Sequence, residues 1–114
     1  MNTLIIYYSK HHENTQEVAE VMVDSIGADV LNYEFVDPDN ISKYQLIGFG
    51  SCIYHRDPGK ELVEFINELK NMENQKAFVF TTSGQGKANY NYYLTQLLRE
   101  KNFEVIGEFT CKEF

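Results

Sequence analysis

The chain has 114 residues, and its 10 Lys and Arg residues against 17 Asp and Glu residues give a formal net charge of −7. This length fits one compact domain, residues 1–114, and the acidic balance argues against nucleic-acid binding and against docking on anionic membranes, since both rely on Lys and Arg. Hydrophobic residues make up 43% and charged residues 24%, the composition of a folded globule rather than of a disordered chain.

Cysteine usage and hydropathy predict a protein of the reduced cytoplasm. No apolar run is long enough to cross a membrane, and none follows a basic start as in a signal peptide. The two cysteines, Cys52 and Cys111, are too few for a disulfide scaffold and lack zinc-binding spacing.

The first half of the chain predicts three strands and one helix. The first strand is apolar on both faces, as in the middle of a covered sheet, and the second alternates enough to be an edge strand. Asn14 is a good N-cap for the helix and Gly27 suits its end. The third strand ends at Gly50. The expected elements are strands at residues 3–8, 29–36 and 45–49 and a helix at residues 14–26.

The second half continues the alternation. Asp57 and Pro58 predict an N-cap followed by proline in the first helical position. A dense apolar run predicts a fourth, central strand, and regular alternation from Phe103 to Phe109 predicts a half-covered edge strand. The expected elements are helices at residues 58–70 and 89–101 and strands at residues 76–82 and 103–109. The first helix has a buried stripe of Leu62, Phe65, Ile66 and Leu69, and the second carries Tyr90, Tyr93, Leu94, Leu97 and Leu98. This order predicts a doubly wound α/β sheet.

Ligands of such sheets bind beyond the carboxyl ends of the strands. Three segments rich in small and hydroxyl residues follow strands there, at residues 9–14, 50–57 and 82–87. The first joins a strand to a helix N-terminus, where free backbone N–H groups and the helix dipole favour an anion. Ser9, Asn14 and Thr15 add uncharged donors, so we predict a phosphate site although neither a Walker loop nor GxGxxG is present.

Two other interpretations compete at these segments. His11, His12 and Glu13 suggest a metal site, but no third ligand stands at a motif-like spacing, so we predict no metal. Cys52 is either a reactive thiol or a small buried hydrophobe, and the second is the more frequent case.

Four stretches together resemble the flavodoxin-like family, specifically its short members with a Ser-x-His-His-x-Asn-Thr phosphate loop. They are residues 8–15 (Tyr-Ser-Lys-His-His-Glu-Asn-Thr), 46–54 (Leu-Ile-Gly-Phe-Gly-Ser-Cys-Ile-Tyr), 78–84 (Phe-Val-Phe-Thr-Thr-Ser-Gly) and 104–112 (Glu-Val-Ile-Gly-Glu-Phe-Thr-Cys-Lys). The resemblance covers essentially the whole chain, and it implies a five-stranded parallel sheet in the order 2-1-3-4-5.

The resemblance also implies an FMN site built from three loops. Tyr54 is a candidate for stacking on the isoalloxazine ring, and the third loop would offer backbone groups to the pyrimidine edge of the flavin. The phosphate loop would comprise Ser9, Lys10, His11, His12, Asn14 and Thr15, the second loop Ser51, Cys52, Ile53 and Tyr54, and the third loop Thr82, Ser83, Gly84, Gln85 and Gly86.

Two departures from the family pattern affect these expectations. Cys52 stands where such loops often have a glycine whose peptide turns toward the protonated flavin N5, and a side chain makes positive φ costlier. The chain also stops at Phe114, before the family's last helix. Strands 3 and 4 would then expose apolar residues on the face of helix 14–26, so we expect self-association or docking on another chain through that face.

The resemblance implies an electron carrier that shuttles electrons between a reductase and an acceptor protein, with the redox chemistry supplied by FMN. No paired carboxylates, Ser/His/Asp set or Cys/His pair indicates a dedicated catalytic residue. Two alternatives are an NAD(P)H-dependent FMN or quinone reductase on the same fold, and a flavin-free interaction module derived from it. In a carrier, the acidic first half, with 3 basic and 9 acidic residues in positions 1–57, would attract a basic partner.

Overall fold

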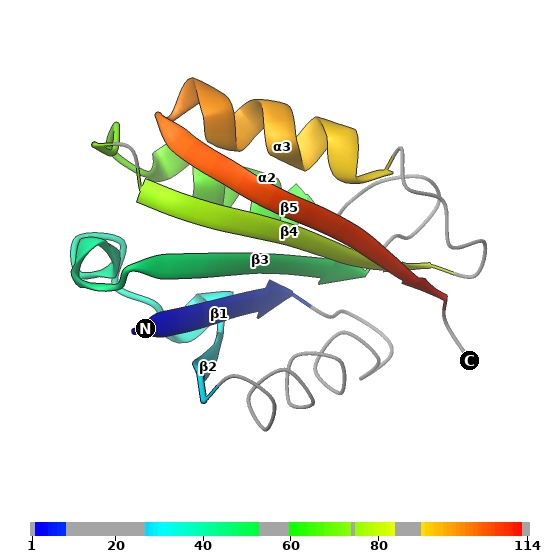
Figure 1. The fold of residues 1–114 in the computed structure, drawn as a ribbon, viewed down its shortest axis with the longest axis horizontal. Helices are drawn as coiled ribbons and strands as arrows, with labels where there is room; N and C mark the ends of the chain where they lie inside the picture. Colours follow the sequence, from blue (N-terminus) through cyan, green and yellow to red (C-terminus); the bar gives the residue numbers. More distant parts are fainter. Residues whose placement is uncertain (1, 9–26, 53–59, 74, 84–89, 113–114) are drawn as a thin grey trace.

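The fold is a five-stranded, fully parallel sheet in the order β2-β1-β3-β4-β5, which confirms the predicted fold class and strand order (Figure 1). The structure is a computed structural model, and it describes residues 2–8, 27–52, 60–73, 75–83 and 90–112. The predicted helix at 14–26, with its cap Asn14, lies outside these residues. So do Asp57 and Pro58.

The described elements follow the predicted alternation of strands and helices. The strands are β1 (Thr3–Tyr8), β2 (Asp29–Asn32), β3 (Leu46–Cys52), β4 (Gln75–Ser83) and β5 (Phe103–Lys112); the α-helices are α2 (Lys60–Glu68) and α3 (Tyr90–Glu100); and the short 3₁₀ helices are η1 (Tyr33–Phe35) and η2 (Ile41–Lys43).

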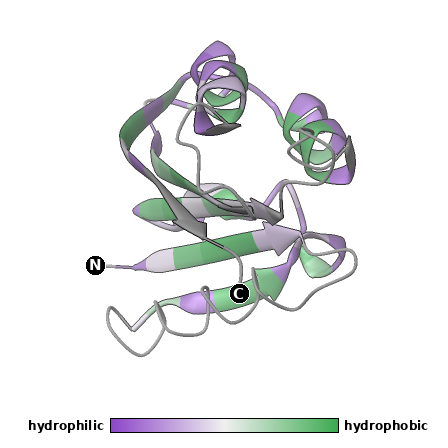
Figure 2. Cartoon of the chain, turned by 90° about the vertical axis from the view of Figure 1, so that its right-hand side faces the viewer, coloured by the Kyte–Doolittle hydropathy of each residue, from purple (hydrophilic) through white to green (hydrophobic). Residues whose placement is uncertain are grey.

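One face of the sheet packs against both helices, which lie on the same side in Figure 2, as right-handed crossovers require. Phe49 of β3 is fully buried there and meets Phe103 edge to face, with ring centroids 5.5 Å apart. The predicted stripe of α2 is confirmed, because its apolar residues are buried in this core. In α3, Leu94 and Leu98 are buried and Leu97 partly so, whereas Tyr93 is half exposed. The buried members from the helices are Leu62, Phe65, Ile66, Leu69, Leu94 and Leu98.

The other face of the sheet is covered in part by its own side chains. On this face β3 presents Gly48 and Gly50, and the rings of Phe78 and Phe80 from β4 lie directly over them. A Cβ atom at either glycine would overlap the tip of the phenylalanine ring. Phe80 is therefore fully buried and Phe78 partly buried. The predicted exposure of apolar side chains on strands 3 and 4 does not apply to the centre of β3, because positions 48 and 50 are glycines.

The second strand is shorter than predicted. It ends at Asn32 rather than at residue 36, because the Asn32 side chain accepts a hydrogen bond from the Glu34 backbone N–H at 3.1 Å. This contact caps η1 and turns the chain away from the ladder. Val36, predicted to be in the strand, is buried in the core just after η1.

The last strand carries a β-bulge that changes which side chains face the helices. Ala77 pairs with Val105 and Phe78 with Gly107, so Ile106 is an extra residue without a partner in β4. The predicted alternation from Phe103 to Phe109 is therefore wrong after Val105. Glu108 turns toward α3, where its Oε2 accepts a hydrogen bond from Thr95 Oγ1 at 3.0 Å. Ile106 stays 55% exposed.

Candidate functional site

Three strands of this sheet, β1, β3 and β4, end side by side (Figure 1). We call this side of the sheet, where the carboxyl ends of the strands lie, the carboxyl edge. Tyr8, the last residue of β1, pairs with Ser51 of β3, and Cys52 pairs with Thr82 of β4. The chain therefore enters each of the three predicted loops from neighbouring positions. This is the arrangement in which parallel α/β sheets bind ligands.

The structure divides the predicted site residues into two groups. Ser51, Cys52, Thr82 and Ser83 belong to the ends of β3 and β4, because both strands run further than the predicted 45–49 and 76–82. The remaining predicted site residues lie outside the described part of the chain; they are Ser9, Lys10, His11, His12, Asn14, Thr15, Ile53, Tyr54, Gly84, Gln85 and Gly86.

Cys52 has strand geometry in this structure. Its backbone is paired with Thr82, and within the described residues Asn102 is the sole non-glycine residue with positive φ, at 70°. The peptide that follows β3 therefore starts from an extended conformation.

A buried polar layer lies between α3 and the carboxyl end of the sheet, and the sequence reasoning missed it. It comprises Ser51, Thr81, Asn91 and Thr95, all buried. Within the described residues Thr81 Oγ1 has no hydrogen-bond partner, and a buried hydroxyl normally has one. The detectable signal was the change from Phe78-Val79-Phe80 to three consecutive hydroxyl residues. The core is therefore polar where it approaches the candidate site.

Aromatic side chains pack at the same edge near β2. Tyr8 contacts Tyr33 with centroids 5.5 Å apart, and Tyr33 contacts Phe65 of α2 at 6.4 Å. Burial raises the pKa of the Tyr33 phenol, and the negative charges of Glu34, Glu61 and Glu64 raise it further because they disfavour the phenolate. The surroundings of Tyr33 are thus distinctly acidic.

Exposed aromatic residues lie on both sides of this edge. Phe35 of η1 is 75% exposed, and Tyr92 and Tyr93 in the first turn of α3 are 65% and 50% exposed. These two tyrosines are surface residues. Large exposed rings beside a candidate site are suited to contact with another molecule.

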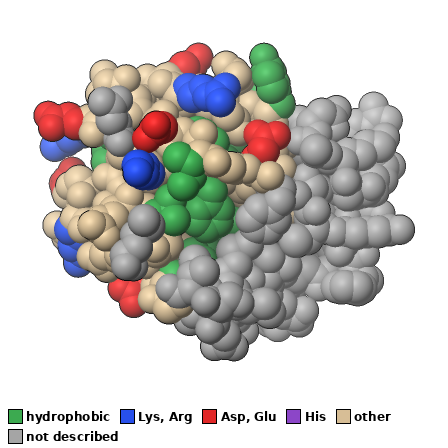
Figure 3. All heavy atoms as spheres, viewed as in Figure 1, with side chains coloured by type: hydrophobic (Ala, Val, Ile, Leu, Met, Phe, Trp, Pro, Cys, Tyr) green, Lys and Arg blue, Asp and Glu red, His purple; other side chains and the backbone are tan. Residues whose placement is uncertain are grey.

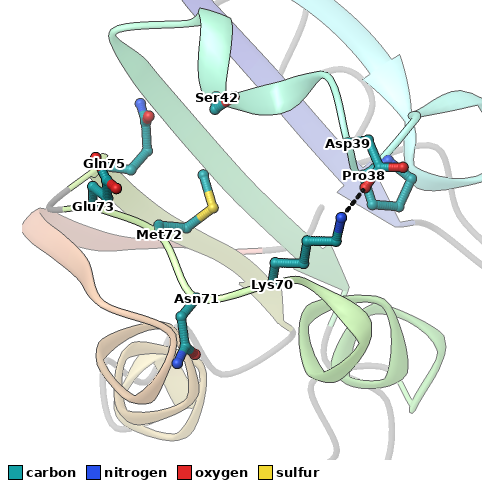
Figure 4. Close-up of a pocket in the computed structure, with 8 residues that line it drawn as sticks. All are labelled: Pro38, Asp39, Ser42, Lys70, Asn71, Met72, Glu73 and Gln75. Atoms are coloured by element: carbon teal, nitrogen blue, oxygen red, sulfur yellow. Dashed lines mark ion pairs between the residues drawn. The ribbon is translucent and has the colours of Figure 1, made fainter.

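A cleft of about 470 Å³ lies at the opposite edge of the sheet, before β4 begins (Figure 4). Lys70 Nζ and Asp39 Oδ1 face each other across it at 3.5 Å, and both side chains are well exposed. Such an exposed ion pair contributes little to stability. The lining combines charges of both signs with amides, and it shows no convergent set of donors: Pro38, Asp39, Ser42, Lys70, Asn71, Met72, Glu73 and Gln75.

Neither a metal-binding cluster nor a membrane-spanning helix is found among the described residues. No group of three or more His, Cys, Asp or Glu side chains in this part of the chain is arranged to hold a metal ion. His11, His12 and Glu13 lie outside the described residues. No helix among the described segments is long and apolar enough to cross a membrane.

The strand order and the loop-bearing carboxyl edge define a doubly wound α/β protein of the flavodoxin type. Comparison with known proteins agrees: residues 4–111 match the flavodoxin domain family, and the chain belongs to that family.

A relative from Methanocaldococcus jannaschii, an uncharacterized protein, is 40% identical over 116 aligned positions, which cover 100% of this chain and 77% of the relative. Solved structures share the fold at lower identity. A flavodoxin from the domain Archaea superposes with a TM-score of 0.84 at 18% identity, covering 100% of this chain and 86% of that one. Two-electron reduced Megasphaera elsdenii flavodoxin superposes with a TM-score of 0.82 at 20% identity, covering 96% of this chain and 85% of that one. A flavoprotein from Lactobacillus acidophilus in complex with FMN superposes with a TM-score of 0.77 at 18% identity, covering 96% of this chain and 92% of that one.

Proposed function

We propose that this protein binds FMN at the carboxyl edge of the sheet and carries electrons between redox proteins. The observation that carries the proposal is the pairing of Tyr8 with Ser51 and of Cys52 with Thr82 in a chain of the flavodoxin family. This pairing brings the starts of all three predicted loops together. A solved neighbour with the same fold is a complex with FMN, which supports the choice of cofactor.

The residues at this edge fit an uncharged mode of phosphate and flavin binding. The ends of β3 and β4 carry hydroxyl residues, and the buried hydroxyl of Thr81 lies in β4, two residues before the strand ends at Ser83. Ser9, Asn14 and Thr15 would hold the phosphate through side-chain and backbone donors. A site without a cluster of positive charge is compatible with a net charge of −7.

FMN would supply the redox chemistry, and the chain would bind it, orient it and set its electrostatic surroundings. Tyr54 is the proposed stacking residue in the second loop. The extended backbone at Cys52 determines the direction from which that loop leaves the sheet. The negative charges of Glu34, Glu61 and Glu64 would disfavour additional negative charge nearby.

A carrier also needs a surface for its partners. Glu34, Glu61 and Glu64 surround Tyr33 beside the exposed ring of Phe35 at the carboxyl edge. An acidic rim with an apolar centre suits a reductase or acceptor whose docking surface is basic, because opposite charges accelerate the encounter. We therefore propose redox proteins as partners.

The first experiment is a visible absorption spectrum of the purified protein followed by titration of FMN fluorescence. Flavin bands with quenching on binding are expected. The double variant Asn14→Ala/Thr15→Ala should weaken FMN binding roughly tenfold or more while the protein remains folded, because two donors to the phosphate are removed. Unchanged affinity in this variant would refute the phosphate-loop assignment. Folded protein that binds no FMN would refute the proposed function.

A second experiment separates a carrier from a reductase. NADPH is added to the FMN-loaded protein without any reductase, and flavin absorbance is followed. A carrier is expected to stay oxidised until a reductase is added. Rapid bleaching by NADPH alone would assign the protein to the NAD(P)H-dependent reductases instead.

A further inference from the structure

We propose that a second copy of this chain docks on the sheet face opposite α2 and α3, through a patch on β3, β4 and β5. The patch consists of Leu46, Phe78 and Ile106, with Lys76 and Glu104 at its border. This inference is independent of FMN binding, because the patch lies toward the amino ends of the strands rather than at the carboxyl edge.

The apolar part of the patch stands out on the surface. Hydrophobic side chains gather over β4 and its neighbours in the middle of the face in view, next to a basic and an acidic side chain (Figure 3). Leu46 and Phe78 are partly buried, and Ile106 is 55% exposed. The β-bulge is the cause of that exposure, because the extra residue in β5 has no partner in β4.

The charges on this face indicate a second copy rather than a different kind of partner. Lys76 pairs with Glu104 in the register of β4 and β5, and both side chains are exposed. Of the described strand residues that point to this face, these two alone are charged. The face is thus locally neutral although the chain carries −7, so repulsion between copies is weakest here.

The same two charges are self-complementary. Neither has an ion-pair partner among the residues described. A twofold axis running along the strands between β4 and β5 places β4 of one copy opposite β5 of the other. Lys76 then faces Glu104 of the second copy, and the reverse pair forms at the symmetric position. Phe78 of β4 then faces Ile106 of the second copy, about two residues further along the strands than the ion pairs, with the sheets packed face to face.

The test measures the oligomeric state of the full chain by light scattering after size exclusion and by sedimentation velocity. A dimer is expected. Lys76→Glu and Glu104→Lys should each raise its dissociation constant roughly tenfold or more, because each replaces two attractions by two repulsions. The double variant Lys76→Glu/Glu104→Lys should restore the original value. Lys70→Glu alters an exposed lysine outside the patch, so it is the matched control and should leave the dissociation constant unchanged.

A second pair of variants tests the apolar contact. Ile106→Asp is expected to leave a monomer, whereas Phe35→Asp, which alters a still more exposed apolar residue in η1, should leave the dimer intact. Circular dichroism melting checks that both variants fold. A monomer at every accessible concentration would overturn the proposal. So would a dimer whose dissociation constant is unchanged by the charge substitutions. A monomer that binds a hydrophobic dye through Ile106 would also overturn it and leave the face to a different chain.

Discussion

The two faces of the sheet are built on different principles. On the helix side, large side chains such as Phe49 and Ile47 project from the strands and are covered by residues of α2 and α3. On the opposite side, β3 contributes Gly48 and Gly50, and the tips of the rings of Phe78 and Phe80 lie over these glycines. The first face is buried by another layer, whereas the centre of the second is buried by the neighbouring strand. Among the described residues, the backbone of β3 is thus covered on this face by rings of the adjacent strand, and the two glycines leave the room that these rings occupy.

The largest loss of stability is expected from a substitution in the helix-covered face. Phe49→Ala removes a fully buried ring that packs against Phe103, and it should lower the free energy of unfolding by about 3–5 kcal/mol. Urea denaturation followed by circular dichroism measures this change. Phe35→Ala deletes the same atoms from a mostly exposed position and should cost well under about 1 kcal/mol. Similar losses in both variants would show that burial on this face does not determine stability.

A smaller but more specific effect is expected on the glycine face. Gly50→Ala places a methyl group against the fully buried ring of Phe80, which has no free space to move into, so about 1–3 kcal/mol of stability should be lost. Gly107→Ala is the control, because a Cβ atom there meets nothing within 4 Å. Differential scanning calorimetry compares the two. A Gly50→Ala variant as stable as the control would mean that the ring does not rely on glycine for its position.

The smallest expected effect concerns the polar end of the helix-covered face. Thr95→Val keeps the shape of the side chain but removes the donor to Glu108, so about 0.5–1.5 kcal/mol should be lost. Thr95→Ser retains the hydroxyl and should recover most of the hydrogen-bond contribution. Thermal unfolding of the pair distinguishes them. Equal melting temperatures for the valine and serine variants would indicate that this hydrogen bond contributes nothing measurable.

Sequence reasoning was successful where a signal is carried by many residues. The uninterrupted apolar run of β1 predicts a central strand, and the spacing of Leu62, Phe65 and Leu69 predicts the buried side of α2. Family resemblance added the strand order, which no local pattern contains. These elements are determined by burial on a scale that periodicity detects.

The predictions that failed concern features that depend on single side chains. The hydrogen bond from Asn32 to Glu34 ends β2, although the following residues still alternate like a strand. The bulge at Ile106 occurs within a pattern that looks regular from Phe103 onward, because the register of β5 depends on its pairing with β4. In the candidate site, the burial of Ser51 could not be predicted, since a hydroxyl after an apolar strand usually signals the start of a loop.

The contact between Gly50 and Phe80 restricts how this sequence can evolve. A larger residue at position 50 overlaps the ring, and a smaller residue at position 80 uncovers the backbone of β3. Either change alone is unfavourable, while a combined change that moves the bulk from β4 to β3 preserves the filled volume. The two positions are therefore expected to show strong epistasis and to covary as a pair, as are Gly48 and Phe78.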